Sequence, residues 1–213
     1  MNAVQPVRLA LYRASVGARR ATSVARFEPT PSRCLIAVAD AAHCALDMKV
    51  AAGIASLEHY AGFLRVLYRL HRDIDALYAN RVLRIALPDL QEWRRLPAIA
   101  NQLSALRCAL PAPGTGLMDV EQAWTTALGW LFVGEAANLY AIALHRLTCR
   151  RGLNGSFGNR YPNKTSEVAM QRWRALNGAL DTLTMLPTEE EEVIIGAEHA
   201  VRQLNHYVRL ESP

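Results

Sequence analysis

Two short stretches of the sequence combine residue types that can hold a metal centre and act on what it binds. The first runs from Asp40 to Asp47 and places one histidine, His43, beside a run of apolar residues. A neutral imidazole is a common ligand for transition metals, and its second ring nitrogen needs a partner that fixes the tautomer. We expect Asp47, one helical turn further on, or a backbone carbonyl to be that partner. On its own, a single helical histidine is more often an ordinary core or boundary residue.

The second stretch, from Leu128 to Tyr140, is apolar on every side of a helix, yet it carries one carboxylate and one amide, Glu135 and Asn138. A helix that is hydrophobic all round is usually buried, and polar groups inside it need partners. Its glycines, at positions 129 and 134, each cost about 1 kcal/mol relative to alanine in a helix. They therefore predict close backbone packing or a ligand nearby.

A di-iron carboxylate site is a weaker interpretation of these residues. Such a bundle needs Glu-x-x-His motifs on two helices, and no histidine of the chain follows a glutamate at that spacing; only Asp40 precedes His43 in this way. We expect most of the other histidines to be solvated or locally hydrogen-bonded. They are His59, His71, His145, His199 and His206.

The bulk composition predicts a soluble, single-domain protein. The 213 residues are 51% hydrophobic, which is enough to bury a full core in one domain, and no apolar run reaches the length of a membrane span. The four cysteines show neither a CxxC pair nor zinc-type spacing, so we expect free thiols in a reducing compartment and a cytoplasmic location. They are Cys34, Cys44, Cys108 and Cys149.

The net charge of +5 is concentrated near the N-terminus. We interpret residues 1–30 as a basic, poorly ordered extension and residues 31–213 as the folded domain. The alternatives are an organelle transit peptide or a basic arm that contacts anionic partners. Without this segment the chain is close to neutral, so nucleic-acid binding is not favoured. The arginines of the basic segment and its border are Arg8, Arg13, Arg19, Arg20, Arg26 and Arg33.

Helical periodicity dominates the rest of the chain, and alternating strand patterns are nearly absent. The first helix is expected to begin at Thr30-Pro31-Ser32, with an apolar stripe that includes Leu35, Val38, Ala42 and Leu46. The later helices are expected at 56–80, 88–108 (interrupted near Pro97), 119–152, 165–185 and from 187 onward. The sequence therefore predicts an all-α bundle.

Capping patterns and loops give the expected ends of these helices. Asp119, with Gln122 three residues later, predicts a capping box for the long central helix, and Thr188 with Glu191 predicts a second one for the last helix. Residues 111–116 and 152–164 are rich in Pro, Gly and Asn and are expected to be loops.

Four stretches, in matching order and spacing, resemble the bacterial heme oxygenase family, in particular its iron-scavenging type. Residues 42–47 are similar to the proximal-helix motif whose histidine binds the iron, and residues 59–78 resemble the family's second helix. Residues 127–135 look like the start of its distal helix. Residues 173–176, followed by the acidic run 189–192, resemble its C-terminal pair of helices.

This resemblance implies a single-domain heme-oxygenase-like helical bundle that clamps heme between a proximal and a distal helix, with His43 as the iron ligand. It also implies the family's reaction, in which dioxygen and electrons from an external donor (a reductase or ascorbate) open heme to biliverdin, iron and carbon monoxide. Arg146 lies where the family often has a cation for the heme propionates, and Arg33 or Lys49 are alternatives.

The chain departs from the family in the distal helix. The family has two glycines, four residues apart, after the acidic residue that matches Glu135; this chain has Ala136 and Tyr140. Such glycines leave room for dioxygen and allow a bend. Tyr140 either rotates out, fills the oxygen site or offers a phenolate to iron, and Gly134 offers another place for the bend.

Gly134, Ala136 and Tyr140 are therefore the expected catalytic side of the site. Two functions remain open on this basis. One is a heme oxygenase. The other is a non-catalytic relative that binds heme or another tetrapyrrole, senses it or serves as an interaction module, having lost turnover through Ala136 and Tyr140.

Overall fold

The computed structural model describes residues 31–50, 57–150 and 163–211, and the side chains of all of these except 48–50, 57, 143–150 and 163–166. The extension predicted for residues 1–30, and with it the proposed domain boundary, lies outside the described residues, as does most of the loop predicted at 152–164. The described part of the chain is helical without a strand, which confirms the all-α prediction.

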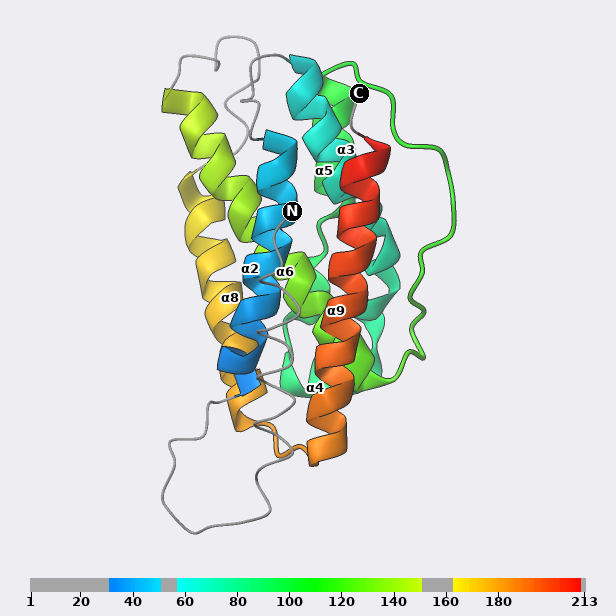
Figure 1. The fold of residues 1–213 in the computed structure, drawn as a ribbon, viewed down its shortest axis with the longest axis vertical. Coiled ribbons are helices and arrows are strands. Elements are labelled where there is room, and N and C mark those ends of the chain that lie inside the picture. The colour runs from blue at the N-terminus through cyan, green and yellow to red at the C-terminus, as the bar shows by residue number, and fades with distance from the viewer. Residues whose placement is uncertain (1–30, 51–56, 151–162, 212–213) are drawn as a thin grey trace.

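Seven α-helices and two short 3-10 helices make up the described ranges (Figure 1). The α-helices are α2 Pro31–Val50, α3 Leu57–Asp73, α4 Arg81–Ala86, α5 Leu96–Ala105, α6 Trp124–Arg150, α8 Asn163–Thr182 and α9 Pro187–Leu210. The 3-10 helices are η2 Asp75–Ala79 and η3 Leu90–Trp93.

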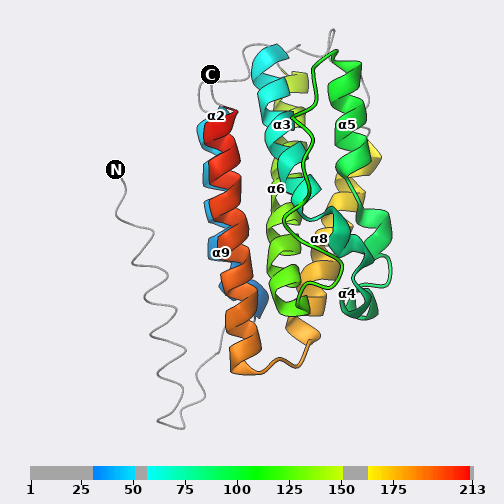
Figure 2. The same ribbon diagram turned by 90° about the vertical axis from the view of Figure 1, so that its right-hand side faces the viewer.

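The long helix α6 is the centre of the bundle. It packs against α2, α8 and α9, while α3 packs against α5 and α9. Figure 2 shows α2 and α9 together on one side, α3 and α6 in the middle, and α4 and α5 on the far side. Every residue of α6 from Ala127 to Asn138 is buried, in keeping with a helix that is apolar all round.

Helix α2 forms as its sequence predicts. Pro31 occupies the first turn, and Asp181 of α8 accepts hydrogen bonds from the Ser32 backbone N–H (3.1 Å) and hydroxyl (3.0 Å), which satisfies donors at the helix start. The predicted apolar stripe is buried: it consists of Leu35, Val38, Ala42 and Leu46. One side of α2 is thereby held against the core.

Glycines allow α6 and α9 to approach closely. A Cβ on Gly196 would lie 2.6 Å from the Thr126 carbonyl oxygen, and a Cβ on Gly129 would collide with the Val193 carbonyl oxygen. The packing role expected for Gly129 is therefore confirmed, and it concerns another helix of the bundle.

The helix predicted at 56–80 ends earlier. Helix α3 stops at Asp73, η2 follows, and α4, which was not predicted, begins after Asn80. The Asn80 side-chain oxygen accepts from the backbone N–H groups of Val82 and Leu83, each at 3.1 Å, and so caps a new helix. In the segment predicted at 88–108, the interruption is at residues 94–95, and Pro97 lies in the first turn of α5.

The capping box predicted at Asp119 is wrong. The Asp119 carboxylate accepts from the Glu121 N–H at 2.8 Å, and α6 begins only at Trp124. Asn80 explains the delay, because its Nδ2 donates to the carbonyls of Val120 and Gln122 at 3.0 and 3.1 Å and holds this segment outside a helix.

The acidic residue at the start of α9 also differs from the prediction. It is Glu189, whose carboxylate accepts from the Leu186 backbone N–H at 2.7 Å, in place of the predicted Glu191. The helix itself begins at Pro187 as expected. The prediction chose the wrong glutamate of the acidic run 189–192, because residue type alone does not distinguish its members.

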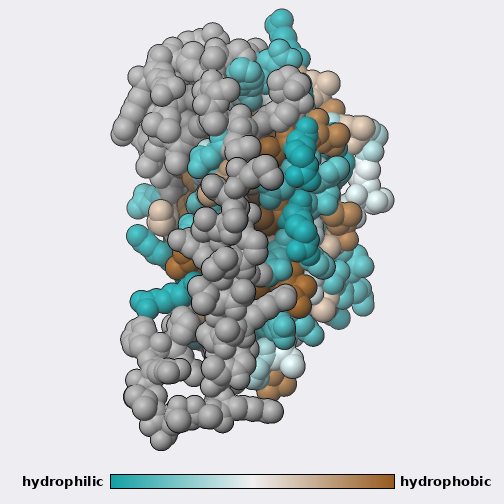
Figure 3. Space-filling model, in the orientation of Figure 1, coloured by the Kyte–Doolittle hydropathy of each residue, from teal (hydrophilic) through white to brown (hydrophobic). Residues whose placement is uncertain are grey.

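Within the described ranges no helix is both long and apolar enough to cross a membrane. On the face drawn in Figure 3, apolar residues of the described chain appear as separate areas among hydrophilic ones.

Candidate functional site

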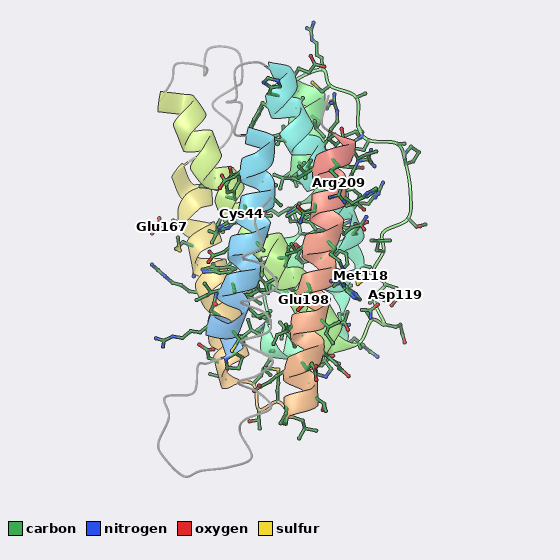
Figure 4. The ribbon with its side chains drawn as sticks, viewed as in Figure 1. Cys44, Met118, Asp119, Glu167, Glu198 and Arg209 are labelled. Atoms are coloured by element: carbon green, nitrogen blue, oxygen red, sulfur yellow. The ribbon has the colours of Figure 1, made fainter. Side chains whose placement is uncertain are left out.

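The imidazole of His43 points from α2 at the backbone of α6. Its Nε2 lies 3.0 Å from the carbonyl oxygen of Ala136. A carbonyl oxygen only accepts hydrogen bonds, so Nε2 carries the proton in this arrangement. This contact is made by the ring nitrogen that faces α6, so the partner expected for the second ring nitrogen stays a prediction. Figure 4 labels Cys44, the residue after His43, on the stretch of α2 that runs beside α6.

Tyr140 lies in the same interface, one helical turn further along α6. Its hydroxyl donates to Oδ1 of Asp47 on α2 at 2.5 Å, and its ring lies 5.7 Å from the His43 ring and 6.1 Å from that of Phe63, centroid to centroid. Tyr140 thus lies between α2 and α6 in this structure. Asp47 is thereby engaged by Tyr140, and it is not the partner of His43.

The phenol of Tyr140 is a neutral group here. Partial burial raises its pKa above the ordinary value of 10, and the hydrogen bond and negative charge of Asp47 raise it further. A phenolate is therefore disfavoured in this conformation.

Gly134 faces another part of the molecule. A Cβ at this position would lie 2.6 Å from Cδ1 of Ile74, at the end of α3. In a helix, residues four apart share a face, so Gly134 shares its side of α6 with Asn138, while Ala136 shares the side facing α2 with Tyr140. The structure therefore brings His43, Ala136 and Tyr140 together and leaves Gly134 apart from them.

The side chain of Arg146 lies outside those that the structure describes. Its backbone belongs to α6, two turns beyond Asn138. Its expected role at the propionates thus stays a prediction.

Behind α6, on the side facing α3, a buried polar cluster begins at His71. This histidine is fully buried, and its Nε2 lies 3.0 Å from Oδ1 of Asn138. Burial, together with the positive charge of Arg95, lowers the pKa of His71 from 6.5 to about 4. The ring is therefore neutral at physiological pH, with one nitrogen donating to Asn138 and the other able to accept.

Glu135 is the centre of the same cluster. It is 1% exposed, and its Oε1 has no hydrogen-bond partner among the described residues, as is also true of the buried Tyr78 hydroxyl. Burial raises the pKa of the Glu135 carboxyl, while Arg95, Asn138 and Arg172 act in the opposite direction. Buried polar atoms of this kind are normally satisfied by ordered water. The cluster can thus hold and exchange protons directly behind α6.

The sequence analysis did not single out His71, Tyr78 or Arg95. A signal for His71 was present, since it follows Leu67 by four residues and precedes Ile74 by three, on the buried stripe of its helix. A histidine on such a stripe is expected to be buried, and a buried imidazole needs a partner.

Among the residues described, no group of three or more His, Cys, Asp or Glu side chains gathers at one point as a metal site would require.

Comparisons with known proteins agree with one another. No family model matches the chain. It is 28% identical to heme oxygenase PigA of Pseudomonas aeruginosa over 146 residues, which cover 68% of this chain and 74% of that protein. Its structure is similar to that of the NO- and CO-bound heme oxygenase from Neisseria meningitidis, with a TM-score of 0.70 and 28% identity, covering 86% of this chain and 92% of the other.

Proposed function

Since the chain belongs to the bacterial heme oxygenase family by sequence and by fold, we propose that it binds heme between α2 and α6 and degrades it with dioxygen. The products would be biliverdin, iron and carbon monoxide, and an external reductase or ascorbate would supply electrons. The observation that carries this proposal is the His43 imidazole, whose Nε2 points out of α2 at the backbone of α6.

Both the imidazole of His43 and the direction in which its Nε2 points suit heme binding. A single neutral imidazole is the usual axial donor to heme iron, and Nε2, the atom required, is the one that faces the opposite helix. In the described conformation α2 and α6 are in direct contact, with 3.0 Å between Nε2 and the Ala136 oxygen. Heme would enter only as the helices part, and the proton on Nε2 would have to leave that nitrogen.

When bound, heme would supply the iron chemistry that activates dioxygen. The task of this chain would be to hold the ring and to deliver protons. His43 would hold the iron from α2. Ala136, whose methyl group is the smallest side chain after that of glycine, would let the α6 backbone lie close to the ring. The carboxyl of Glu135 and the neutral His71, behind that backbone, would hold protons within reach through Asn138 and water.

The test is to mix purified protein with hemin and ascorbate under air and to record the absorbance spectrum and the release of carbon monoxide. We expect a sharp Soret band that gives way to a biliverdin spectrum. Binding with an unchanged band after substitution of His43 by alanine would overturn the assignment of the axial ligand.

One observation favours a second candidate function. Tyr140 lies between α2 and α6, where the proposed heme would bind, and its hydroxyl donates to Asp47 there. A heme carrier or sensor without turnover would bind hemin and leave it intact in the same assay. Tyr140→Gly would then be expected to produce some ring opening, and its failure to do so would count against a lost oxygenase.

A further inference from the structure

Among the described side chains, two hydrogen bonds join α2 to α6, and they lie in register. His43 contacts Ala136 and Asp47 contacts Tyr140; both pairs are 93 residues apart in sequence. The two helices therefore run in parallel here, and the second contact lies one turn beyond the first on each helix. Four residues of helix correspond to about 6 Å. We call the contact of His43 with Ala136 the first rung of this interface and the contact of Asp47 with Tyr140 the second rung.

A macrocycle bound to His43 is incompatible with the second rung. A porphyrin is a flat ring wider than one helical turn, so a ring held by His43 would also need the space one turn further on, where Asp47 and Tyr140 meet. These two groups are joined by a direct 2.5 Å hydrogen bond. The ring and that hydrogen bond cannot be present at once.

The second rung is the stronger of the two. A phenol that donates to a carboxylate makes a charge-assisted hydrogen bond, which is stronger than one between neutral groups. The Tyr140 ring also packs between His43 and Phe63. Separating α2 from α6 at the site thus requires breaking this bond and exposing part of the ring.

We propose that the Tyr140–Asp47 hydrogen bond is an autoinhibitory latch that holds the α2–α6 interface closed and has to open before a ligand reaches His43. The identity of that ligand as heme rests on the proposed function. The closing action itself concerns only residues of this chain. Since only the open fraction binds, the apparent dissociation constant for heme equals the intrinsic one divided by the open fraction.

The first experiment uses the full chain without ligand. Hydrogen exchange of the α2 amides around residues 40–47 is measured for the unmodified protein, Tyr140→Phe, Asp47→Ala and the double variant. Loss of one such hydrogen bond is expected to speed exchange about three- to tenfold. The double variant should be no faster than either single one, because both remove the same interaction. Unchanged exchange, or additive effects, would overturn the latch.

The second experiment measures hemin association and affinity for the same proteins. Tyr140→Phe is expected to bind about three- to tenfold more tightly and to associate faster. The matched control is Tyr207→Phe, which removes a similar bond, from the Tyr207 hydroxyl to Oδ2 of Asp73 at 2.6 Å, between α9 and α3. It should leave α2 exchange and hemin affinity near those of the unmodified protein.

The two readouts separate the latch from the proposed function. Faster exchange without tighter hemin binding would show that the bond closes the interface without controlling access, and the proposal would fail. If no variant binds hemin, the proposed function falls, and the exchange data still decide whether the Tyr140–Asp47 bond holds the helices together.

Discussion

The two sides of α6 that face α2 and α3 are built in opposite ways. Toward α2, the contacts are a carbonyl against a half-buried imidazole and a phenol against the exposed Asp47. Toward α3, Glu135, Asn138 and His71 are buried and surrounded by other elements. The first side has an exposed edge at Asp47. The second side is buried, and it suits groups whose protonation must be controlled.

The largest effect is expected on the α2 side, from His43→Ala. Removing the imidazole of His43 should lower hemin affinity by about 100-fold or more and abolish the spectrum of histidine-ligated heme. Circular dichroism should show an intact fold, because His43 is only half-buried. Free imidazole should restore the spectrum if the ring is the ligand. No rescue together with normal affinity would place the ligand elsewhere.

On the α3 side, the buried His71 is expected to make the free energy of unfolding depend on pH. The pKa of His71 is about 4 in the folded protein and 6.5 in the unfolded chain, so the unfolded state binds the extra proton first on acidification. The contribution of His71 to the free energy of unfolding is therefore complete above pH 6.5. It is lost as the pH falls toward 4, and the loss is up to about 3 kcal/mol.

Urea denaturation at pH 7 and at pH 4.5 would measure this loss, with His71→Gln as the control. The glutamine variant supplies a side-chain amide that can donate a hydrogen bond in place of the imidazole, and it has no proton to gain in this range. It should lose distinctly less stability between the two pH values. An equal loss in both proteins would show that His71 is not the titrating group.

Glu135→Gln tests whether the same side supplies protons. The amide matches the carboxyl in shape, so hemin affinity is expected to stay within about twofold, while ring opening slows by about tenfold or more. Single-turnover decay of the Soret band in ascorbate measures the rate. A slower rate with proportionally weaker hemin binding would instead indicate a change in the pocket.

The smallest effect is expected from Gly134→Ala. The added methyl meets only the terminal Cδ1 of Ile74, which can shift, and alanine favours the helix by about 1 kcal/mol. Thermal unfolding should change little and hemin affinity not at all, because this residue faces α3. Gly196→Ala is the contrast, since its methyl meets the Thr126 backbone and should cost about 1–3 kcal/mol. A large loss of hemin affinity in Gly134→Ala would bring this glycine back into the site.

Local patterns predicted much of this fold. The apolar stripe of α2, the apolar residues all round α6, and the start of α9 at Pro187 are confirmed. Predicted helix ends were wrong where a side chain distant in sequence makes hydrogen bonds to the backbone. Asn80, for instance, both starts α4 and delays α6 through residues 40 and 42 positions away. Local sequence patterns do not predict hydrogen bonds between residues so far apart in sequence.

The candidate site shows the same division. The sequence alone indicated a single imidazole, His43, beside the apolar stripe of one helix. It also indicated a carboxylate and an amide, Glu135 and Asn138, inside a second helix that is apolar all round. Only the tertiary structure decided that Tyr140 engages Asp47, that Gly134 faces away from His43, and that His71 belongs to the buried cluster. Those pairings depend on the rotation and register of helices that are 67 to 93 residues apart in sequence. Packing of the whole bundle sets that register.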